Sequence, residues 1–397
     1  MKRQAPALEA ALAQLEAAQL RRARVTIEHG AATGRILRLA GGRELVDFSS
    51  NDYLGLARHP TVARSMAACA AHLGAGSGAS HLISGHGAEH ARLEEELAAF
   101  TQRERALLFS TGYMANLAVM TALAGRSERV ILDRLCHASL IDGARLSGAQ
   151  LLRYAHADAG EAARLIEADP AHTALLATDG VFSMDGDLAP LPQLASCARA
   201  HDLWLVVDDA HGLGVLGARG GGVLEHFGLG SDAAPILVGT LGKAFGSFGA
   251  FVAGSAALIE FLIQKARTYV YTTALPQPVA AATRAALNIA RLESWRRERL
   301  MALVARFRAA AQAVGVPLAD SSTPIQPVLL GSAAAALAAQ RELAAAGYWV
   351  VAIRPPTVPA GSARLRVTLS AAHSDAQLEG LVEQLGRIGA SARAQAQ

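Results

Sequence analysis

The chain of 397 residues is 52% hydrophobic, which is enough apolar material for a large core and for two or three domains. Its 37 basic and 34 acidic residues leave a net charge of +3 and are scattered, so nothing indicates a nucleic-acid partner. No apolar run approaches a membrane span, and no continuous apolar segment near the N-terminus indicates a secretion signal. We therefore expect no membrane partner and a cytoplasmic location, in agreement with three widely spaced cysteines that form no CxxC motif.

The first predicted element is a helix over residues 6–22. It carries four leucines on one face, Leu8, Leu12, Leu15 and Leu20. The two cations at its end, Arg21 and Arg22, allow two interpretations, because they could complement the negative end of the helix or contact a phosphorylated substrate. Their spacing favours the first.

Two Gly- and Ser-rich stretches, 74–80 and 84–87, come next and lack the lysine that a P-loop carries at the required place. His86 and His90 lie four residues apart on a predicted helix, a spacing that suits metal ligation. With no third ligand nearby we expect no metal site.

Apolar segments that alternate with helical ones dominate residues 100–260 and predict an α/β fold with a mainly parallel sheet. The predicted strands of this part are 106–109, 130–133, 174–178, 203–207, 236–238 and 248–253. A helical region over 277–315 leads to a smaller α/β part with predicted strands at 325–330, 349–353 and 364–369. We expect an N-terminal segment over 1–46, a large domain over 47–285 and a small C-terminal domain over 286–397.

Polar residues follow several of these strands. Ser110 and Thr111 precede a helix, so its first backbone N–H groups form an anion site. His137 follows the strand that ends at Asp133 and is a candidate for stacking on a planar ring. The segment 48–56 contains Asn51, which local sequence favours as a turn residue and which could also donate to a carboxylate.

The most informative stretch is 238–246, in which Lys243 lies on a turn of small residues directly after an apolar strand. Glycines let a ligand approach the backbone, and partial burial favours the neutral amine that Schiff-base chemistry requires. Another buried strand ends in Asp208 and Asp209, of which only one can face the pocket of Lys243, and His211 follows. A carboxylate, an imidazole and a lysine so placed are the parts that hold a pyridoxal phosphate ring.

With these residues in place, the sequence resembles the α-oxoamine synthases, a branch of the fold-type-I pyridoxal-phosphate-dependent transferases in the class II aminotransferase family. The resemblance covers about residues 20–385 and lies in six motifs, at 48–56, 133–143, 180–191, 206–217, 239–249 and 352–373. The last of them, with its Ile-Arg-Pro-Pro-Thr-Val-Pro, separates this chain from the glycine-using relatives. A dinucleotide-binding protein is a poor alternative, because no strand is followed by GxGxxG.

The resemblance implies that Lys243 bonds the cofactor aldehyde and acts as acid and base, that Asp208 pairs with the pyridine nitrogen, and that His137 stacks on the ring. It implies further cofactor contacts from Gly112, Tyr113, Ser183, His211, Thr240, Thr272 and Thr273, with one of the last two reaching in from a second subunit. It implies substrate contacts from Arg21, Asn51, His137, Thr357 and Arg366. The local interpretation of Arg21 therefore gives way to a contact with the acyl thioester.

The reaction that the resemblance implies is a decarboxylative condensation of L-alanine with a pimeloyl thioester, on coenzyme A or acyl carrier protein, in biotin biosynthesis. It also implies a homodimer with active sites at the subunit interface. A glycine- or serine-using synthase of the same branch, and a non-catalytic partner subunit on the same fold, are the alternatives. The chain departs from the family pattern at Asp179, where relatives often carry glutamate, and in the loop 79–81.

Overall fold

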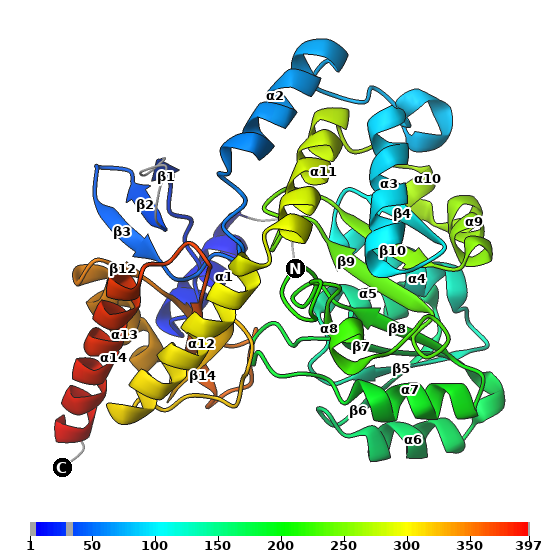
Figure 1. The fold of residues 1–397 in the computed structure, drawn as a ribbon. Helices are drawn as coiled ribbons and strands as arrows, with labels where there is room; N and C mark the ends of the chain where they lie inside the picture. The colour runs from blue at the N-terminus through cyan, green and yellow to red at the C-terminus, as the bar shows by residue number, and fades with distance from the viewer. Residues whose placement is uncertain (1–4, 29–34, 396–397) are drawn as a thin grey trace. The chain divides into compact units, whose positions relative to one another are not determined.

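The computed structural model describes residues 5–28 and 35–395 (Figure 1). Residues 1–4, 29–34 and 396–397, which the expected segments 1–46 and 286–397 include, lie outside the described residues. The chain forms two compact units. The large unit comprises Asn51–Ser183 and Asp187–Arg299, and the small unit comprises Met1–Ser50, Met184–Gly186 and Leu300–Gln397.

The large unit is built on a seven-stranded sheet of order β4-β10-β9-β8-β7-β5-β6. Its strands are β4 (Arg105–Phe109), β5 (Arg129–Asp133), β6 (Gln150–Tyr154), β7 (Thr173–Asp179), β8 (Trp204–Asp208), β9 (Ile236–Thr240) and β10 (Ala250–Gly254). Strands β5 to β9 pair in parallel, whereas β10 is antiparallel to both β4 and β9. The predicted α/β fold with a mainly parallel sheet is confirmed.

Helices cover this sheet because its strands are apolar on both faces. The helices of the large unit are α2 (Pro60–Leu73), α3 (Ala88–Thr101), α4 (Gly112–Leu123), α5 (Ala138–Ser147), α6 (Ala159–Glu167), α7 (Leu191–Ala200), α8 (Val223–Phe227), α9 (Ala256–Lys265), α10 (Arg267–Val270) and α11 (Gln277–Leu292), with the single-turn elements η1 (His81–Gly85) and η2 (Pro170–His172). Alternate residues of the strands share one buried cluster with α4, α5 and α9. The helices α6 and α7 lie side by side and pack on β5, β6 and β8 (Figure 1).

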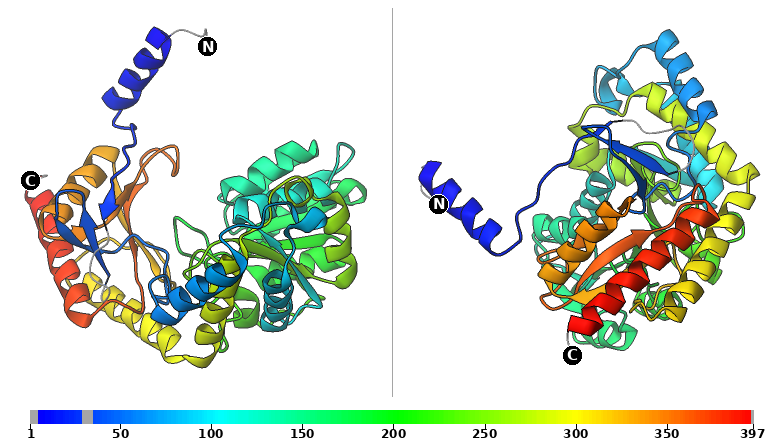
Figure 2. Two further views of the ribbon diagram at one scale, coloured as in Figure 1. Left: turned by 90° about the horizontal axis from the view of Figure 1, so that it is seen from above. Right: turned by 90° about the vertical axis from the view of Figure 1, so that its left-hand side faces the viewer.

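The small unit contains two sheets. The strands β11 (Ile325–Gly331), β14 (Ala363–Thr368) and β13 (Val351–Ile353) form an antiparallel sheet, and β1 (Ile27–Glu28), β2 (Ile36–Leu39), β3 (Glu44–Asp47) and β12 (Tyr348–Trp349) form another. Its helices include α13 (Ala333–Ala345) and α14 (Asp375–Gln395), which lie side by side (Figure 2). The helix α12 (Trp295–Ala313) begins in the large unit and ends in the small one.

The local interpretation of Arg21 and Arg22 is wrong. The N-terminal helix α1 (Ala5–Ala17) ends before them, and Gln19 has a positive φ of 56°, which stops the helix. Arg21 instead pairs with Glu16 at 3.2 Å, so neither arginine lies in the last helical turn. Among the described residues, no helix combines the length and the apolarity that crossing a bilayer would require.

The small unit buries one histidine whose protonation opposes folding. His373 is 2% exposed, stacks on Phe48 at 4.0 Å and uses both ring nitrogens, accepting from Ser370 N and donating to the Asp47 carbonyl. Burial lowers the pKa of His373 to about 3. Because the unfolded chain binds this proton below about pH 6.5 and the folded chain does not, the free energy of unfolding decreases as the pH drops from that value toward about 3.

We predict that replacing His373 by glutamine flattens the acid dependence of stability. Between pH 7 and pH 5 the unmodified chain should lose about 2 kcal/mol of unfolding free energy more than the variant, since a titration of this kind contributes about 1.4 kcal/mol per pH unit. Urea unfolding followed by fluorescence at both pH values measures the difference. The exposed residue His72 supplies the control His72→Gln. Equal pH slopes for His373→Gln and the unmodified chain would contradict this account.

Candidate active site

A cavity of about 190 Å³ lies in the large unit at the carboxyl ends of β7, β8 and β9. Parallel strands end at the same edge, so the polar residues that follow them converge there. The predicted site residues that line it are Gly112, Tyr113, His137, Ser183, Asp208, His211, Thr240 and Lys243. Lys243 and Asp208, which the sequence separates by 35 residues, therefore share one cavity.

Asp208 is held by two donors. Its Oδ2 accepts from Asn116 Nδ2 at 2.6 Å and its Oδ1 accepts from the backbone N of Ala210 at 3.0 Å. The neighbouring Asp209 does not line the cavity and accepts instead from the backbone N of Val223 at 2.7 Å. The alternation of the strand thus presents one of the two carboxylates to the cavity, as predicted.

Lys243 lies at the end of a chain of polar contacts. Its Nζ is 2.9 Å from His211 Nε2, and His211 Nδ1 is 2.6 Å from the hydroxyl of Tyr53. That hydroxyl lies 3.4 Å from Oδ1 of Asn51. The segment 48–56 therefore reaches Lys243 through Tyr53 and His211, which places Asn51 near the site although it does not line the cavity.

His137 caps α5 and is fixed from two sides. Its Nδ1 lies 2.7 Å from the hydroxyl of Ser139, which also accepts from Asn116 Nδ2 at 2.8 Å. Its backbone N donates to Asp179 Oδ1 at 3.1 Å. Burial lowers the pKa of His137, which keeps the ring neutral at pH 7, and the positive charge of Lys243 acts in the same direction.

Asp179 is a second carboxylate on the cavity wall, and burial raises its pKa well above the usual range. The negative charge of Asp208 raises the pKa of Asp179 further, because two carboxylates in one low-dielectric site oppose each other's ionisation. The departure from the family pattern at this position therefore leaves a carboxyl group on the wall, bonded to the backbone of His137.

The opposite part of the wall suits an anion. Gly112 and Tyr113 begin α4, where backbone N–H groups lack intrahelical acceptors, and Thr111 caps the helix by accepting from Met114 N. A Cβ added to Gly112 would have no heavy atom within 4 Å, so the backbone here is open to a ligand. Thr240 adds a hydroxyl that also bonds the Gly249 carbonyl at 3.2 Å.

Several predicted site residues lie outside this cavity. In the large unit, the hydroxyl of Thr272 bonds the Thr268 carbonyl, and Thr273 pairs with Ser80 in an isolated β-bridge. In the small unit, Arg366 is 7% exposed and donates to Thr368, and the hydroxyl of Thr357 accepts from Arg22 rather than from Arg21. Their roles stay predictions.

Three residues that hold the site were not predicted as members of it, namely Tyr53, Asn116 and Ser139. Tyr53 lies within the motif at 48–56, and Ser139 follows His137 by two residues. Asn116 lies one turn into α4, four residues after Gly112, on the face that the anion site already defines. A helical projection from Gly112 could have found it, because residues four apart share one face.

Two expectations about His86 and His90 were wrong, namely that both lie on one helix and that no third ligand lies nearby. The helix α3 begins at Ala88, so His86 precedes it, and His81 from η1 brings a third imidazole within 4.8 Å of the other two. The ring nitrogens of His90 both have partners, because Nδ1 accepts from Gly87 N at 3.0 Å and Nε2 contacts the Leu275 carbonyl at 2.5 Å. Burial lowers the pKa of His81 to about 3, so this cluster is uncharged at neutral pH.

A family model described as aminotransferase class I and II matches residues 43–385 of the chain. The 8-amino-7-oxononanoate synthase of Methylococcus capsulatus is 59% identical over 94% of this chain and 96% of its own length. The chain belongs to the class I and II aminotransferase family, as a relative of the 8-amino-7-oxononanoate synthases. Among solved structures, a K265A variant of serine palmitoyltransferase from S. paucimobilis with a bound PLP–myriocin aldimine has a TM-score of 0.91 and is 28% identical, with 97% of each chain covered. An 8-amino-7-oxononanoate synthase from Francisella tularensis has a TM-score of 0.77 and is 31% identical over 88% of this chain and 99% of its own.

The cofactor of this aminotransferase family is pyridoxal phosphate, and the cavity fits it chemically. The fit rests on a carboxylate with two donors at Asp208, an amine at Lys243, an imidazole on the cavity wall at His137 and open helix N–H groups at Gly112. In addition, Oδ1 of Asn116 is buried and has no hydrogen-bond donor among the described residues. These groups match the pyridine nitrogen, the aldehyde, the ring face and the phosphate of the cofactor.

We predict that Asn116→Leu weakens pyridoxal phosphate binding roughly tenfold or more, because a hydrogen bond to a charged group contributes about 1.5–3 kcal/mol. The substitution removes the donor to Asp208 while it keeps the size of the side chain. Absorbance titration of the protein freed of cofactor measures the dissociation constant. Asn288 lies exposed on α11, and Asn288→Leu should leave this constant unchanged. An unaltered affinity in Asn116→Leu would show that Asp208 needs no support from Asn116.

Proposed function

We propose that this chain condenses L-alanine with a pimeloyl thioester to give 8-amino-7-oxononanoate, carbon dioxide and the free thiol, in biotin biosynthesis. The observation that carries the proposal is one cavity that joins Lys243, Asp208 and His137 in a chain 59% identical to an 8-amino-7-oxononanoate synthase. The alternative of a non-catalytic subunit loses support, because such a subunit has no need of these three residues together.

Lys243 is the base that takes the Cα proton of L-alanine and later returns a proton to that carbon. His211, whose Nε2 lies 2.9 Å from Nζ, and Tyr53 behind it orient the amine and offer the proton a path away from it. Bound pyridoxal phosphate supplies the electron sink that makes the Cα proton acidic. Positioned proton transfer of this kind contributes roughly 10² to 10⁴ in rate.

The condensation then balances without an oxidant or reductant. The Cα of alanine forms a bond to the thioester carbonyl carbon while the carbon–sulfur bond breaks, and the thiolate leaves and takes up a proton from solvent. The alanine carboxylate departs as carbon dioxide, and the Cα receives one proton from Lys243. The side chains proposed to hold the alanine carboxylate are Asn51 and Arg366, and those proposed for the thioester are Arg21 and Thr357.

We also propose a cytoplasmic location, because the three cysteines, Cys69, Cys136 and Cys197, are free thiols that persist in a reducing compartment. Coenzyme A and acyl carrier protein are both candidates for the carrier of the pimeloyl group, and only an assay distinguishes them. A serine- or glycine-using reaction is the second candidate, because the serine palmitoyltransferase above shares the fold over 97% of this chain.

A homodimer is the last part of the proposal, with Thr272 or Thr273 contributing to the cavity of the partner. Support comes from an exposed apolar surface on η1 and beside α10 in the large unit, formed by Leu82, Ile83 and Tyr271, which are 49%, 80% and 71% exposed. Both threonines directly follow Tyr271, so a second copy that covers this surface would meet them.

We predict that purified protein with pyridoxal phosphate releases thiol fastest from L-alanine and a pimeloyl thioester. The assay offers alanine, glycine and serine in turn with pimeloyl, acetyl and palmitoyl thioesters, and mass spectrometry identifies the product. Lys243→Ala should lose turnover and the visible absorbance of the bound cofactor together. Lys265→Ala, on an exposed helix end, should retain both. A higher kcat/KM for glycine or serine would replace this function by the second candidate.

We predict that Ile83→Asp converts the dimer to a monomer, because a carboxylate cannot be buried unpaired in an apolar interface. Light scattering coupled to size exclusion measures the mass. Leu292, which is 75% exposed at the end of α11, supplies the control Leu292→Asp, whose mass should not change. A monomeric unmodified chain, or a dimer that survives Ile83→Asp, would overturn the assignment of this surface.

A further inference from the structure

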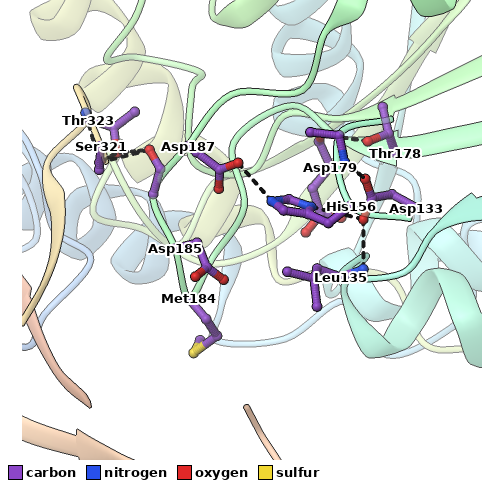
Figure 3. A network of polar contacts seen from close by, with 12 residues as sticks. Asp133, Leu135, His156, Thr178, Asp179, Met184, Asp185, Asp187, Ser321 and Thr323 are labelled. Carbon is purple, nitrogen blue, oxygen red and sulfur yellow. Dashed lines mark hydrogen bonds and ion pairs between the residues drawn. The ribbon is translucent and has the colours of Figure 1, made fainter. Parts of the chain in front are cut away.

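His156 lies between two carboxylates, those of Asp133 and Asp187 (Figure 3). Its Nδ1 is 3.1 Å from Asp133 Oδ1, and its Nε2 is 2.8 Å from Asp187 Oδ2. A carboxylate only accepts, so both bonds require a proton on each ring nitrogen, and the ring is then a cation. Burial opposes this charge, but the hydrogen bonds to both carboxylates outweigh it and raise the pKa of His156 to about 10.

The first carboxylate shapes the turn that leads to His137. Asp133 ends β5 and is fully buried, and besides His156 it accepts from Leu135 N and Ala157 N at 2.7 Å each. His137 follows the turn and lines the cavity. The position of its ring on the wall therefore depends on how Asp133 is held.

The second carboxylate closes the loop that carries Ser183. The backbone N of Phe182 donates to the Asp187 carbonyl at 3.0 Å, so these two residues form the neck of the loop, and Ser183 follows directly on the wall. Oδ1 of Asp187 is buried and has no donor among the described residues. The hydrogen bond to the other oxygen, Oδ2, comes from His156. The Phe182 ring also meets the His156 ring edge-on at 4.3 Å.

We propose that His156 is a positioning residue for the cofactor site, a cation that ties the turn before His137 to the loop of Ser183. It touches neither cofactor nor substrate. It acts by bridging Asp133 and Asp187, so that the two wall segments keep the separation that the cofactor ring needs. This role of His156 concerns the binding of pyridoxal phosphate, so it does not depend on which amino acid or acyl thioester is the substrate.

A neutral side chain at position 156 cannot bridge Asp133 and Asp187 in the same way. A neutral imidazole carries one proton and can donate to only one of the two carboxylates. The other carboxylate, either the fully buried Asp133 or Asp187 with its side chain 27% exposed, would then lack its counter-charge, so its wall segment would move. The bridge therefore needs both a positive charge and two donors.

The test compares cofactor affinity with protein stability in His156→Gln. The control is Arg284→Gln, because Arg284 also bridges two carboxylates, Glu89 and Glu96, and its side chain is 28% exposed, as is that of His156. Both substitutions remove a two-sided bridge in the same unit, but Arg284 does not line the cofactor cavity. We expect similar losses of thermal stability without cofactor, and about a tenfold rise in the pyridoxal phosphate dissociation constant for His156→Gln alone.

A charge-balanced variant provides the rescue. In His156→Gln combined with Asp187→Asn, the two amides can pair and the negative charge that lost its counter-charge is removed, so we expect the affinity to recover at least threefold from that of His156→Gln. Equal dissociation constants in His156→Gln, Arg284→Gln and the unmodified chain would overturn the proposal, and so would strictly additive effects in the combined variant. If His156→Gln does not fold, Asp187→Asn alone, which keeps the bond to Asp133, must show the rise in dissociation constant or the proposal fails.

Discussion

The site depends on the parallel pairing of β7, β8 and β9. The register pairs Asp179 with Asp208, and Asp208 with Val238, so β7 and β8 end level and β9 ends two residues further on, at Thr240. Neighbouring strands lie about 4.8 Å apart, so polar groups after their last residues are forced into one small volume. Burial and mutual charge follow from that geometry, and the raised pKa of Asp179 is one result.

Such a concentration of charge requires a second layer of hydrogen bonds, and the structure supplies it from helices and loops beyond the sheet. Asn116 on α4 donates to both Asp208 and Ser139, and Tyr53 meets His211 from a segment far away in the sequence. His156 joins two wall segments from outside the cavity. The side chains that would act on a substrate are therefore held by a surrounding layer of hydrogen bonds, as is usual where precise placement matters.

The shared fold does not by itself decide the substrate. The serine palmitoyltransferase and the 8-amino-7-oxononanoate synthase with known structures both resemble this chain, at TM-scores of 0.91 and 0.77. The cavity would hold the cofactor that such enzymes have in common, whereas the residues proposed to contact the substrates, such as Arg366 and Thr357, do not line it. The 59% identity to an 8-amino-7-oxononanoate synthase therefore favours one function where the cavity alone would permit several.

The amino-acid sequence by itself determined the class of fold, the strand ends that carry Asp208, His137 and Lys243, and the chemistry that they indicate. These signals are local, because an apolar run, its polar end and the turn after it occupy adjacent positions. Only the tertiary structure decided which polar residues support them, since Tyr53, Asn116 and His156 reach the site through contacts over long sequence separations. It also decided that His81 joins His86 and His90, and that α1 ends before Arg21, because packing and backbone conformation, rather than residue spacing, set both results.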